Sequence, residues 1–385
     1  MQFIDLKTQQ QRILPQLNAR LQAVLAHGQY ILGPENRELE ARLAEYVGTK
    51  HALACSSGTD ALLIALMAYG VGPGDAVFTT PFTFMATAEV ISLTGATPVF
   101  VDIDPATFNI DPHKLAQAAA AVVNNDPSLH PLPQSDRPLT ARGVIAVDLF
   151  GLAADYRAIM AVAAEHDLFV LEDAAQSFGA FSNGRRAGGL GHVAATSFFP
   201  AKPLGCYGDG GAVFTDDDRL AETMRSLRVH GQGSDRYDNV RIGINGRLDT
   251  MQAAVLLCKL DIFDEELAAR QRIAARYSEL LADAPSIRTP HVPEGCISAW
   301  AQYSLLSKNR DAILSHLQRR SIPHAIYYPI PLHLQKAYEP LDYRAGSMPE
   351  AERAAGCIFS LPMHPYLEDG AIAEIAAAVK EAIPD

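Results

Sequence analysis

Short apolar runs alternate with helical segments between about residues 53 and 215, and this alternation restricts the possible fold more than any other feature of the chain. The runs at 144–147 and 168–171 are continuously apolar, which is typical of strands that are covered on both faces. Helical patterns at 60–69 and 156–166 lie between such runs, so we expect a mainly parallel sheet with right-handed crossovers. The predicted strands are residues 76–80, 97–102, 143–148, 168–172, 195–199 and 212–215. The sequence therefore predicts an α/β domain.

The remaining segments predict further helices and a smaller unit. Helical spacing of apolar residues predicts helices at 8–27, at about 35–46 and, as one longer stretch, at 248–282. Beyond residue 286 we expect an α+β unit with strands near 302–306, 325–328 and 357–361 and helices near 311–320, 349–356 and 369–382. The proline-rich segment 124–142 predicts an exposed loop. We thus expect two domains: residues 1–250, an N-terminal arm and large α/β domain, and residues 251–385, a connecting helix and small α+β domain.

The composition excludes several classes of protein. Of the 385 residues, 48% are hydrophobic and 20% are charged, which excludes a disordered chain. The net charge of −12 disfavours a nucleic-acid binder. The five cysteines and the histidines are scattered without metal-ligand spacing, so we expect no metal and no disulfide framework. The chain shows no signal-peptide pattern and no apolar run of about 18 residues, so we expect a cytoplasmic protein without a membrane segment.

Three groups of residues suited to chemistry lie where predicted strands end or helices begin. Asp173 and Gln176 follow the apolar run 168–172. Lys202 lies between two prolines in an apolar segment, where desolvation would lower its pKa and make it a competent nucleophile. Gly58 and Thr59 open an apolar helix, and the free N–H groups at a helix start suit a phosphate. Because ligands bind at the carboxyl edge of parallel strands, we expect these groups to lie together.

An acid, a lysine and a phosphate-binding turn on one sheet edge are what pyridoxal 5′-phosphate (PLP) requires. The acid keeps the pyridine nitrogen protonated, the lysine forms a Schiff base with the aldehyde, and the turn binds the phosphate. Each group also has an ordinary interpretation: Asp173 as a helix cap, Lys202 as a surface loop residue, and Gly58 with Thr59 as plain capping. The combination of all three favours PLP.

Several motifs also resemble those of a known family. They lie, in order, at residues 28–33, 57–62, 83–89, 172–177, 197–205 and 243–249, with further likeness at 328–333 and 360–365. Together they resemble the sugar-nucleotide aminotransferases of the DegT–DnrJ–StrS group, which are PLP enzymes of fold type I. The resemblance covers nearly the whole chain. It implies a mainly parallel sheet flanked by helices, with a smaller C-terminal α+β domain.

The resemblance implies roles for individual residues in cofactor binding. Lys202 would form the Schiff base, Asp173 would pair with the pyridinium, and Gln176 would sit beside the ring oxygen. Phe84 would stack on the pyridine ring, although a phenylalanine at such a position is equally often part of a core. The residues implied to contact the phosphate are Gly58, Thr59, Ser197 and, from a second subunit, Asn245. The active site would thus be shared across a homodimer.

The residues implied on the substrate side are Gly28, Tyr30, Arg247, Tyr327 and Tyr328. Arg247 would act in trans near the nucleotide sugar, because an anionic substrate needs arginine in an acidic protein. It could instead form an ion pair with Asp249 at a helix start. Tyr327 and Tyr328 could be ordinary strand residues.

By resemblance, the protein would transfer an amino group from L-glutamate to the keto carbon of a nucleotide-linked sugar. The likeness is closest to enzymes that aminate C3 of a UDP-linked 3-keto-N-acetylhexosaminuronic acid for surface polysaccharide, such as the O-antigen of lipopolysaccharide. Tyr327 stands where a histidine is often found, Ala201 stands where a serine often precedes the lysine, and the insertion 124–142 is longer than usual. A dehydratase is disfavoured because Lys202 is present where those relatives have histidine. The alternatives are a C4 aminotransferase of a dTDP- or GDP-sugar and a non-catalytic PLP-binding regulator.

Overall fold

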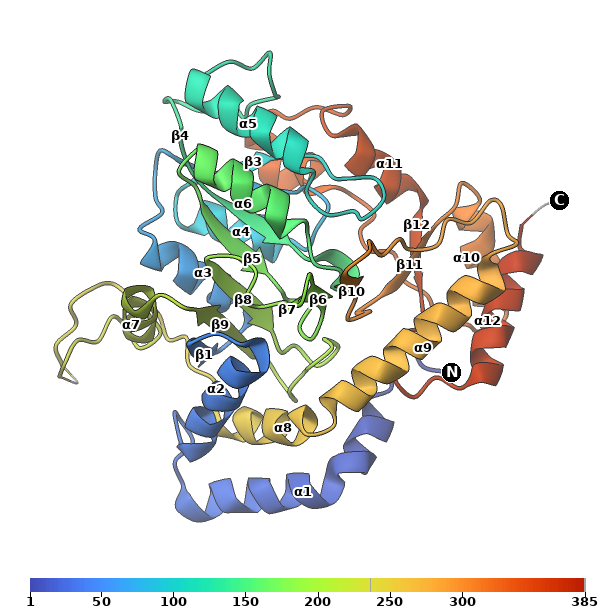
Figure 1. Ribbon diagram of the computed structural model, residues 1–385, viewed down its shortest axis with the longest axis horizontal. Coiled ribbons are helices and arrows are strands. Elements are labelled where there is room, and N and C mark those ends of the chain that lie inside the picture. Colours follow the sequence, from blue (N-terminus) through green and yellow to red (C-terminus); the bar gives the residue numbers. More distant parts are fainter. Residues whose placement is uncertain (236, 384–385) are drawn as a thin grey trace.

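A seven-stranded sheet lies at the centre of the computed structural model, which describes residues 1–235 and 237–383 (Figure 1). The spatial order of the strands is β1-β9-β8-β5-β4-β2-β3. Their bounds are β1 His51–Cys55, β2 Asp75–Thr79, β3 Thr97–Phe100, β4 Thr140–Val147, β5 Phe169–Asp173, β8 Val193–Ser197 and β9 Gly211–Thr215. All of these strands are parallel except β9, which is antiparallel to β1 and β8. The predicted α/β sheet is confirmed, and β1 is a strand that the sequence analysis did not assign.

The reversed direction of β9 decides where Lys202 lies. The parallel strands β1, β5 and β8 all end at one edge of the sheet, and β9 begins at that same edge. The segment 198–210 therefore leaves β8 and returns to the sheet without crossing it. Lys202 is part of this segment, so it lies at the carboxyl edge, where open α/β sheets bind ligands.

Helices cover both faces of the sheet, as the continuously apolar strands predicted. Alternate residues of β1 show why: Ala52 and Ala54 pack into one buried cluster, and Leu53 and Cys55 pack into another. One face carries α3 Gly58–Ala68, α4 Ala86–Leu93 and α7 Asp218–Leu227. The other carries α2 Pro34–Val47, α5 Pro112–Asn124, α6 Tyr156–Glu165 and α8 Thr250–Leu260. Figure 1 shows α1 Leu6–His27 beside α8.

The prediction of one long helix over 248–282 is wrong, because the segment forms two helices. The helix α8 ends at Leu260, and α9 Phe263–Leu281 begins after Ile262, whose φ of −110° and ψ of 2° are not helical. The first turn of α9 is acidic, with Asp264, Glu265 and Glu266, which stabilises a new helix start. The apolar spacing continues across the break, so periodicity did not reveal it. In Figure 1 the two helices point in different directions.

The C-terminal part has its own buried cluster around a two-stranded sheet. This sheet pairs β11 Tyr303–Leu306 with β12 Ile358–Leu361, and the helices around it are α9, α10 Arg310–Arg319, α11 Pro349–Cys357 and α12 Asp369–Glu381. The predicted strand at 325–328 is wrong, because only Ala325 forms a bridge, to Ser360. Proline cannot donate a ladder hydrogen bond, and Pro323 and Pro329 flank the segment.

Smaller elements complete the described chain. They are β6 Phe181–Ser182, β7 Arg185–Arg186, β10 Cys296–Ile297 and the short 3-10 helices η1 Leu149–Gly151, η2 Leu332–Leu334 and η3 Lys336–Leu341. The proline-rich segment is irregular between Asn124 and Thr140, as predicted, although its last residues begin β4. Within residues 1–235 and 237–383, none of the helices combines the length and apolar character needed to cross a bilayer. The same residues contain no group of three or more His, Cys, Asp or Glu side chains arranged to hold a metal ion.

Candidate active site

Lys202 lies in the loop that leaves β8, between Pro200 and Pro203. Its backbone N–H donates to the carbonyl of Phe199 at 2.9 Å, which closes a tight turn. Burial lowers the pKa of Lys202, while the nearby Asp173 carboxylate raises it. The amine is therefore held at a desolvated place beside a negative charge, which is the setting expected for a nucleophilic lysine.

Asp173 is the last residue of β5 and is 6% exposed. Its Oδ2 accepts a hydrogen bond from Thr87 Oγ1 at 2.8 Å, and its Oδ1 accepts one from the Ala175 N–H at 3.2 Å. Burial raises the pKa of Asp173, and both donors together with the Lys202 charge lower it. Sequence reasoning missed Thr87. The sequence carries no signal for this contact, because it joins residues 86 positions apart.

Gln176 links three parts of the chain. Its Oε1 accepts a hydrogen bond from the Phe150 N–H at 2.9 Å, and its Nε2 donates to the Tyr328 hydroxyl at 3.4 Å. Tyr328 is an edge-on neighbour of Phe82, with ring centroids 6.4 Å apart, and burial raises the pKa of its phenol. Tyr328 thus comes from the C-terminal half to contact Gln176, and it is not part of a strand.

The turn at Gly58 lies against the end of β8. A Cβ on Gly58 would be 2.6 Å from the Cβ of Ser197, so no side chain fits at this position. Ser57 caps α3 by accepting from the Asp60 N–H at 3.0 Å, and the Asp60 carboxylate accepts from the Ser56 hydroxyl. The first N–H groups of a helix have no intrahelical acceptor, so Gly58 and Thr59 can bind an anion here.

Phe84 is 57% exposed and lies two residues before Ala86, the first residue of α4. This exposure excludes the interpretation of Phe84 as a core residue. Its backbone carbonyl accepts from the Thr87 N–H at 3.3 Å, which joins it to the residue that binds Asp173.

Five of the expected residues make no hydrogen bond, ion pair or ring contact to Lys202 or Asp173 in the described chain. Gly28 and the half-exposed Tyr30 lie between α1 and α2, where the Tyr30 carbonyl accepts from the Thr250 N–H at 2.9 Å. Asn245 is exposed, and the neighbouring Gly246 carbonyl accepts from the Ser56 N–H at 3.2 Å. Arg247 forms no ion pair with Asp249, and its Nε is buried without a partner among the described residues. Tyr327 contacts the ring of Tyr328, with centroids 5.8 Å apart, and lies near Phe3, with centroids 6.4 Å apart.

A buried carboxylate supports the site from behind. Asp148 accepts hydrogen bonds from Ser177 Oγ at 2.6 Å and Tyr156 Oη at 2.9 Å, and its N–H donates to the Asp173 carbonyl at 3.1 Å. Glu172 interacts with Asp148 and accepts from three backbone N–H groups of residues 188–191. Burial raises the pKa of both acids, that of Glu172 to about 7. Sequence reasoning singled out neither acid for this role.

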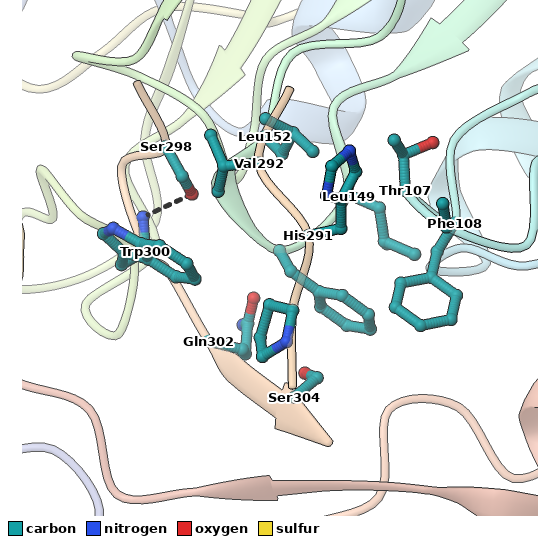
Figure 2. Close-up of a pocket in the computed structure, with 13 residues that line it drawn as sticks. Thr107, Phe108, Leu149, Leu152, His291, Val292, Ser298, Trp300, Gln302 and Ser304 are labelled. Carbon is teal, nitrogen blue, oxygen red and sulfur yellow. Dashed lines mark hydrogen bonds between the residues drawn. The ribbon is translucent and has the colours of Figure 1, made fainter. Parts of the chain in front are cut away.

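The same corner contacts the C-terminal part of the chain. Figure 2 shows the adjoining pocket, lined by Leu149 and Leu152 on one side and by Trp300 and Ser304 on the other. The Trp300 N–H donates to Ser298 Oγ at 3.0 Å. A Cβ on Gly151 would lie 2.6 Å from the Trp300 backbone nitrogen, so the two segments meet backbone to backbone.

Comparison with known proteins agrees with this geometry. The model of the DegT/DnrJ/EryC1/StrS aminotransferase family matches residues 11–380. The chain belongs to this family. It is 50% identical over 378 residues to the UDP-2-acetamido-2-deoxy-3-oxo-D-glucuronate aminotransferase of Pseudomonas aeruginosa, covering 98% of this chain and 99% of the relative.

Two solved structures of this family's fold extend the comparison. A DegT DnrJ EryC1 StrS aminotransferase from Brucella abortus superposes with a TM-score of 0.94 at 51% identity and covers 99% of each chain. NtdA from Bacillus subtilis, solved with bound pyridoxamine phosphate (PMP), has a TM-score of 0.84 at 28% identity and covers 98% of this chain and 83% of its own. The protein is therefore a PLP-dependent aminotransferase with the predicted fold.

The residues present fit PLP. A buried carboxylate, a desolvated lysine and a helix start at Gly58, where no side chain fits, lie at the same edge of one sheet. These match the ring nitrogen, the aldehyde and the phosphate of the cofactor in charge and in chemistry.

Proposed function

We propose that this aminotransferase moves an amino group from L-glutamate to C3 of a UDP-linked 3-keto-N-acetylhexosaminuronic acid, as a cytoplasmic homodimer that supplies surface polysaccharide such as the O-antigen of lipopolysaccharide. The observation that carries the choice of substrate is the 50% identity, over nearly the full length of both chains, to an enzyme named for that substrate. The arrangement of Lys202, Asp173 and the Gly58 turn supports the class of chemistry.

In this proposal, the cofactor is held by residues of the sheet edge. Lys202 Nζ would hold the aldehyde carbon, and Asp173 would pair with the ring nitrogen, where its buried charge would keep that nitrogen protonated. Phe84 would stack on the ring and Gln176 would lie beside the ring oxygen. The phosphate would be bound by Gly58, Thr59 and Ser197, and by Asn245 of the partner subunit.

When bound, PLP supplies an electron sink that stabilises negative charge on the substrate carbon. Lys202 Nζ then serves as the base and acid that moves the proton at that carbon, a role suited to an amine whose pKa is lowered by burial. Donor and acceptor use the same group in turn, so the kinetics are ping-pong.

The acceptor is an anion, and the protein has a net charge of −12, so local positive charge must bind it. Arg247 supplies this charge in trans. Arg247 is partly exposed and forms no ion pair within the described chain, so its guanidinium charge is available to a ligand or a second subunit. The other proposed substrate contacts are Gly28, Tyr30, Tyr327 and Tyr328.

A homodimer is supported by apolar side chains that one chain leaves in solvent. Phe199 is 52% exposed near Lys202, and Val240 and Ile242 are 55% and 88% exposed in the segment before Asn245. Figure 1 shows this segment, after α7, projecting from the body of the molecule. Exposed apolar patches of this kind mark protein interfaces.

Two measurements test the proposal. Adding L-glutamate to the PLP-loaded protein should replace the yellow absorbance band with that of pyridoxamine phosphate, and the Lys202→Ala variant should fold but show no such change. The acceptor is tested in reverse, by supplying 2-oxoglutarate with either a UDP-3-amino sugar acid or a dTDP-4-amino sugar. Turnover of the dTDP-sugar alone would overturn the proposed substrate, and a yellow band that ignores glutamate would indicate another donor or a regulator.

A further inference from the structure

A buried lysine and a glutamine on α8 contact the loop that carries Lys202, and the proposed mechanism uses neither. Lys259 is 1% exposed, and its Nζ has no hydrogen-bond acceptor among the described residues. That Nζ lies 4.3 Å from the centre of the Tyr207 ring. An ammonium buried without a carboxylate contact is costly, and the ring face offsets part of that cost.

Gln252, two turns earlier on the same helix, binds the backbone of the same tyrosine. Its Oε1 accepts from the Tyr207 N–H at 2.8 Å, and its Nε2 donates to the Tyr207 carbonyl at 3.2 Å. A single side chain thus satisfies both backbone groups of one loop residue. Tyr207 is therefore fixed to α8 through its backbone by Gln252 and through its ring by Lys259.

Tyr207 ends the turn in which Lys202 lies. The Cys206 N–H donates to the Phe198 carbonyl at 2.8 Å, which closes the loop at its base. Within the loop, a Cβ on Gly205 would lie 2.6 Å from the carbonyl oxygens of Phe199 and Pro200, so the backbone is packed on itself. Because this loop is short, closed and tightly packed, a displacement of Tyr207 would also displace Lys202.

We propose that Gln252 is a positioning residue for Lys202: by bonding both backbone groups of Tyr207, it fixes the Lys202 loop to α8. Lys259 provides a second tie to the same residue through the ring. Reacting groups lose much of their rate when misplaced by about 1 Å, because the productive geometry is then rarely reached. The inference rests on the proposed role of Lys202.

The test compares Gln252→Met with a matched control, Gln271→Met. Gln271 on α9 is also half-buried, and it also donates to a backbone carbonyl, that of Ser298, and accepts from an N–H, the indole of Trp300 at 2.8 Å. It has no contact with the Lys202 loop. Three quantities are measured on full-length protein: kcat and KM for L-glutamate, the pH midpoint of the yellow absorbance band, and the rate at which an amine-selective reagent modifies Lys202 in cofactor-free protein.

For Gln252→Met we expect kcat to fall by about 10-fold or more with KM within about 2-fold, the midpoint to shift by about half a pH unit, and the modification rate of Lys202 to change. Gln271→Met should lower thermal stability and leave all three quantities unchanged. If Gln252→Met matches the wild type in the midpoint and the modification rate, the inference is wrong.

A second variant, Gln252→Glu, tests the inference if Gln252→Met folds poorly. Gln252→Glu keeps the acceptor for the Tyr207 N–H and loses the donor to the Tyr207 carbonyl. It should therefore shift the pH midpoint of the yellow absorbance band in the same direction as Gln252→Met, by a smaller amount. An unchanged midpoint would overturn the inference. Failure of the underlying proposal is recognised separately, because Lys202→Ala would then retain turnover. An inactive Lys202→Ala with a normal Gln252→Met contradicts only the positioning role.

Discussion

At the scale of single residues, the Asp173 carboxylate depends on a hydroxyl from another element. Thr87 Oγ1 donates to Asp173 Oδ2 at 2.8 Å inside a buried site. Removing this donor with Thr87→Val should raise the pKa of Asp173 and weaken its pairing with the cofactor's ring nitrogen. A hydrogen bond to a charged group contributes about 1.5–3 kcal/mol, so we expect roughly 10-fold to 100-fold weaker PLP binding. Titration of cofactor-free protein with PLP measures this.

Thr83→Val is the control for this prediction, because the Thr83 hydroxyl contacts Thr87 at 3.1 Å and makes no hydrogen bond to Asp173 within the described chain. It should weaken PLP binding much less. Equal dissociation constants for wild type and Thr87→Val would show that the hydroxyl does not support the charge.

Lys202 and Asp173 were predictable as a pair because each follows a strand that its own sequence marks, and parallel strands share an edge. Thr87 was not, since its contact with Asp173 joins residues 86 positions apart and depends on where α4 lies over the sheet. The same reason applies to Tyr328, which reaches Gln176 across 152 positions.

At the scale of elements, the pairing of β4 with β5 depends on a glycine opposite an aromatic ring. Gly143 pairs with Phe169, and a Cβ on Gly143 would overlap the ring of Phe169, which stacks on Tyr69 at a centroid distance of 4.2 Å. Gly143→Ala should therefore reduce the free energy of unfolding by about 1–3 kcal/mol through overpacking. Chemical denaturation measures the change.

Gly356→Ala in α11 is the control, because a Cβ there would meet no atom within 4 Å. Alanine favours a helix over glycine by about 0.8–1 kcal/mol, so this variant should be neutral or more stable than the wild type. A Gly143→Ala variant as stable as Gly356→Ala would mean that the Phe169 ring moves aside freely.

The buried acids behind β5 predict a pH dependence of stability. Burial raises the pKa of Asp148, and it raises that of Glu172 from 4.5 to about 7. The folded chain then holds protons that the unfolded chain releases, so the free energy of unfolding should fall as the pH rises from about 4.5 to about 7. Glu172 accepts three N–H hydrogen bonds, which favours the proton on Asp148.

Asp148→Asn should flatten this dependence, since asparagine resembles the protonated acid and carries no charge to repel Glu172. Denaturation of both proteins at pH 5, 6, 7 and 8, each saturated with PLP, measures the difference between them. If the difference in free energy of unfolding between the two proteins does not vary with pH, Asp148 and Glu172 do not hold a proton in the folded chain.

Element boundaries show what periodicity can and cannot predict. Six of the seven strands of the large sheet, all except β1, were predicted to within a few residues because they are apolar on both faces. The break between α8 and α9 was not predicted, because the apolar spacing continues across it. The irregular segment 325–328 was wrongly predicted as a strand, because its β-branched and aromatic residues favour a strand despite the flanking prolines.

At the scale of the whole molecule, our proposal places the active site across two chains. Asn245 and Arg247 lie apart from Lys202, and exposed apolar residues lie between Val229 and Asn245 on a projecting segment. A sequence alone cannot reveal whether a residue contributes to the active site of its own chain or to that of its partner, since the motifs are the same in both cases. Mixed dimers reveal it, because they distinguish residues that act within one chain from residues that act across two.

Lys202→Ala and Asn245→Ala should each be inactive or nearly so as homodimers, and a mixture refolded together should recover activity. In a mixed dimer, one site combines Lys202 of one chain with Asn245 of the partner subunit and is intact, while the other site has lost both. Random pairing makes about half of the dimers mixed, so about a quarter of the wild-type activity should return.

The control is a mixture of Lys202→Ala with Asp173→Ala. These two residues influence each other within one chain, so no mixed dimer has a complete site and no activity should return. Equal recovery in both mixtures, or none in the first, would contradict a site shared between subunits.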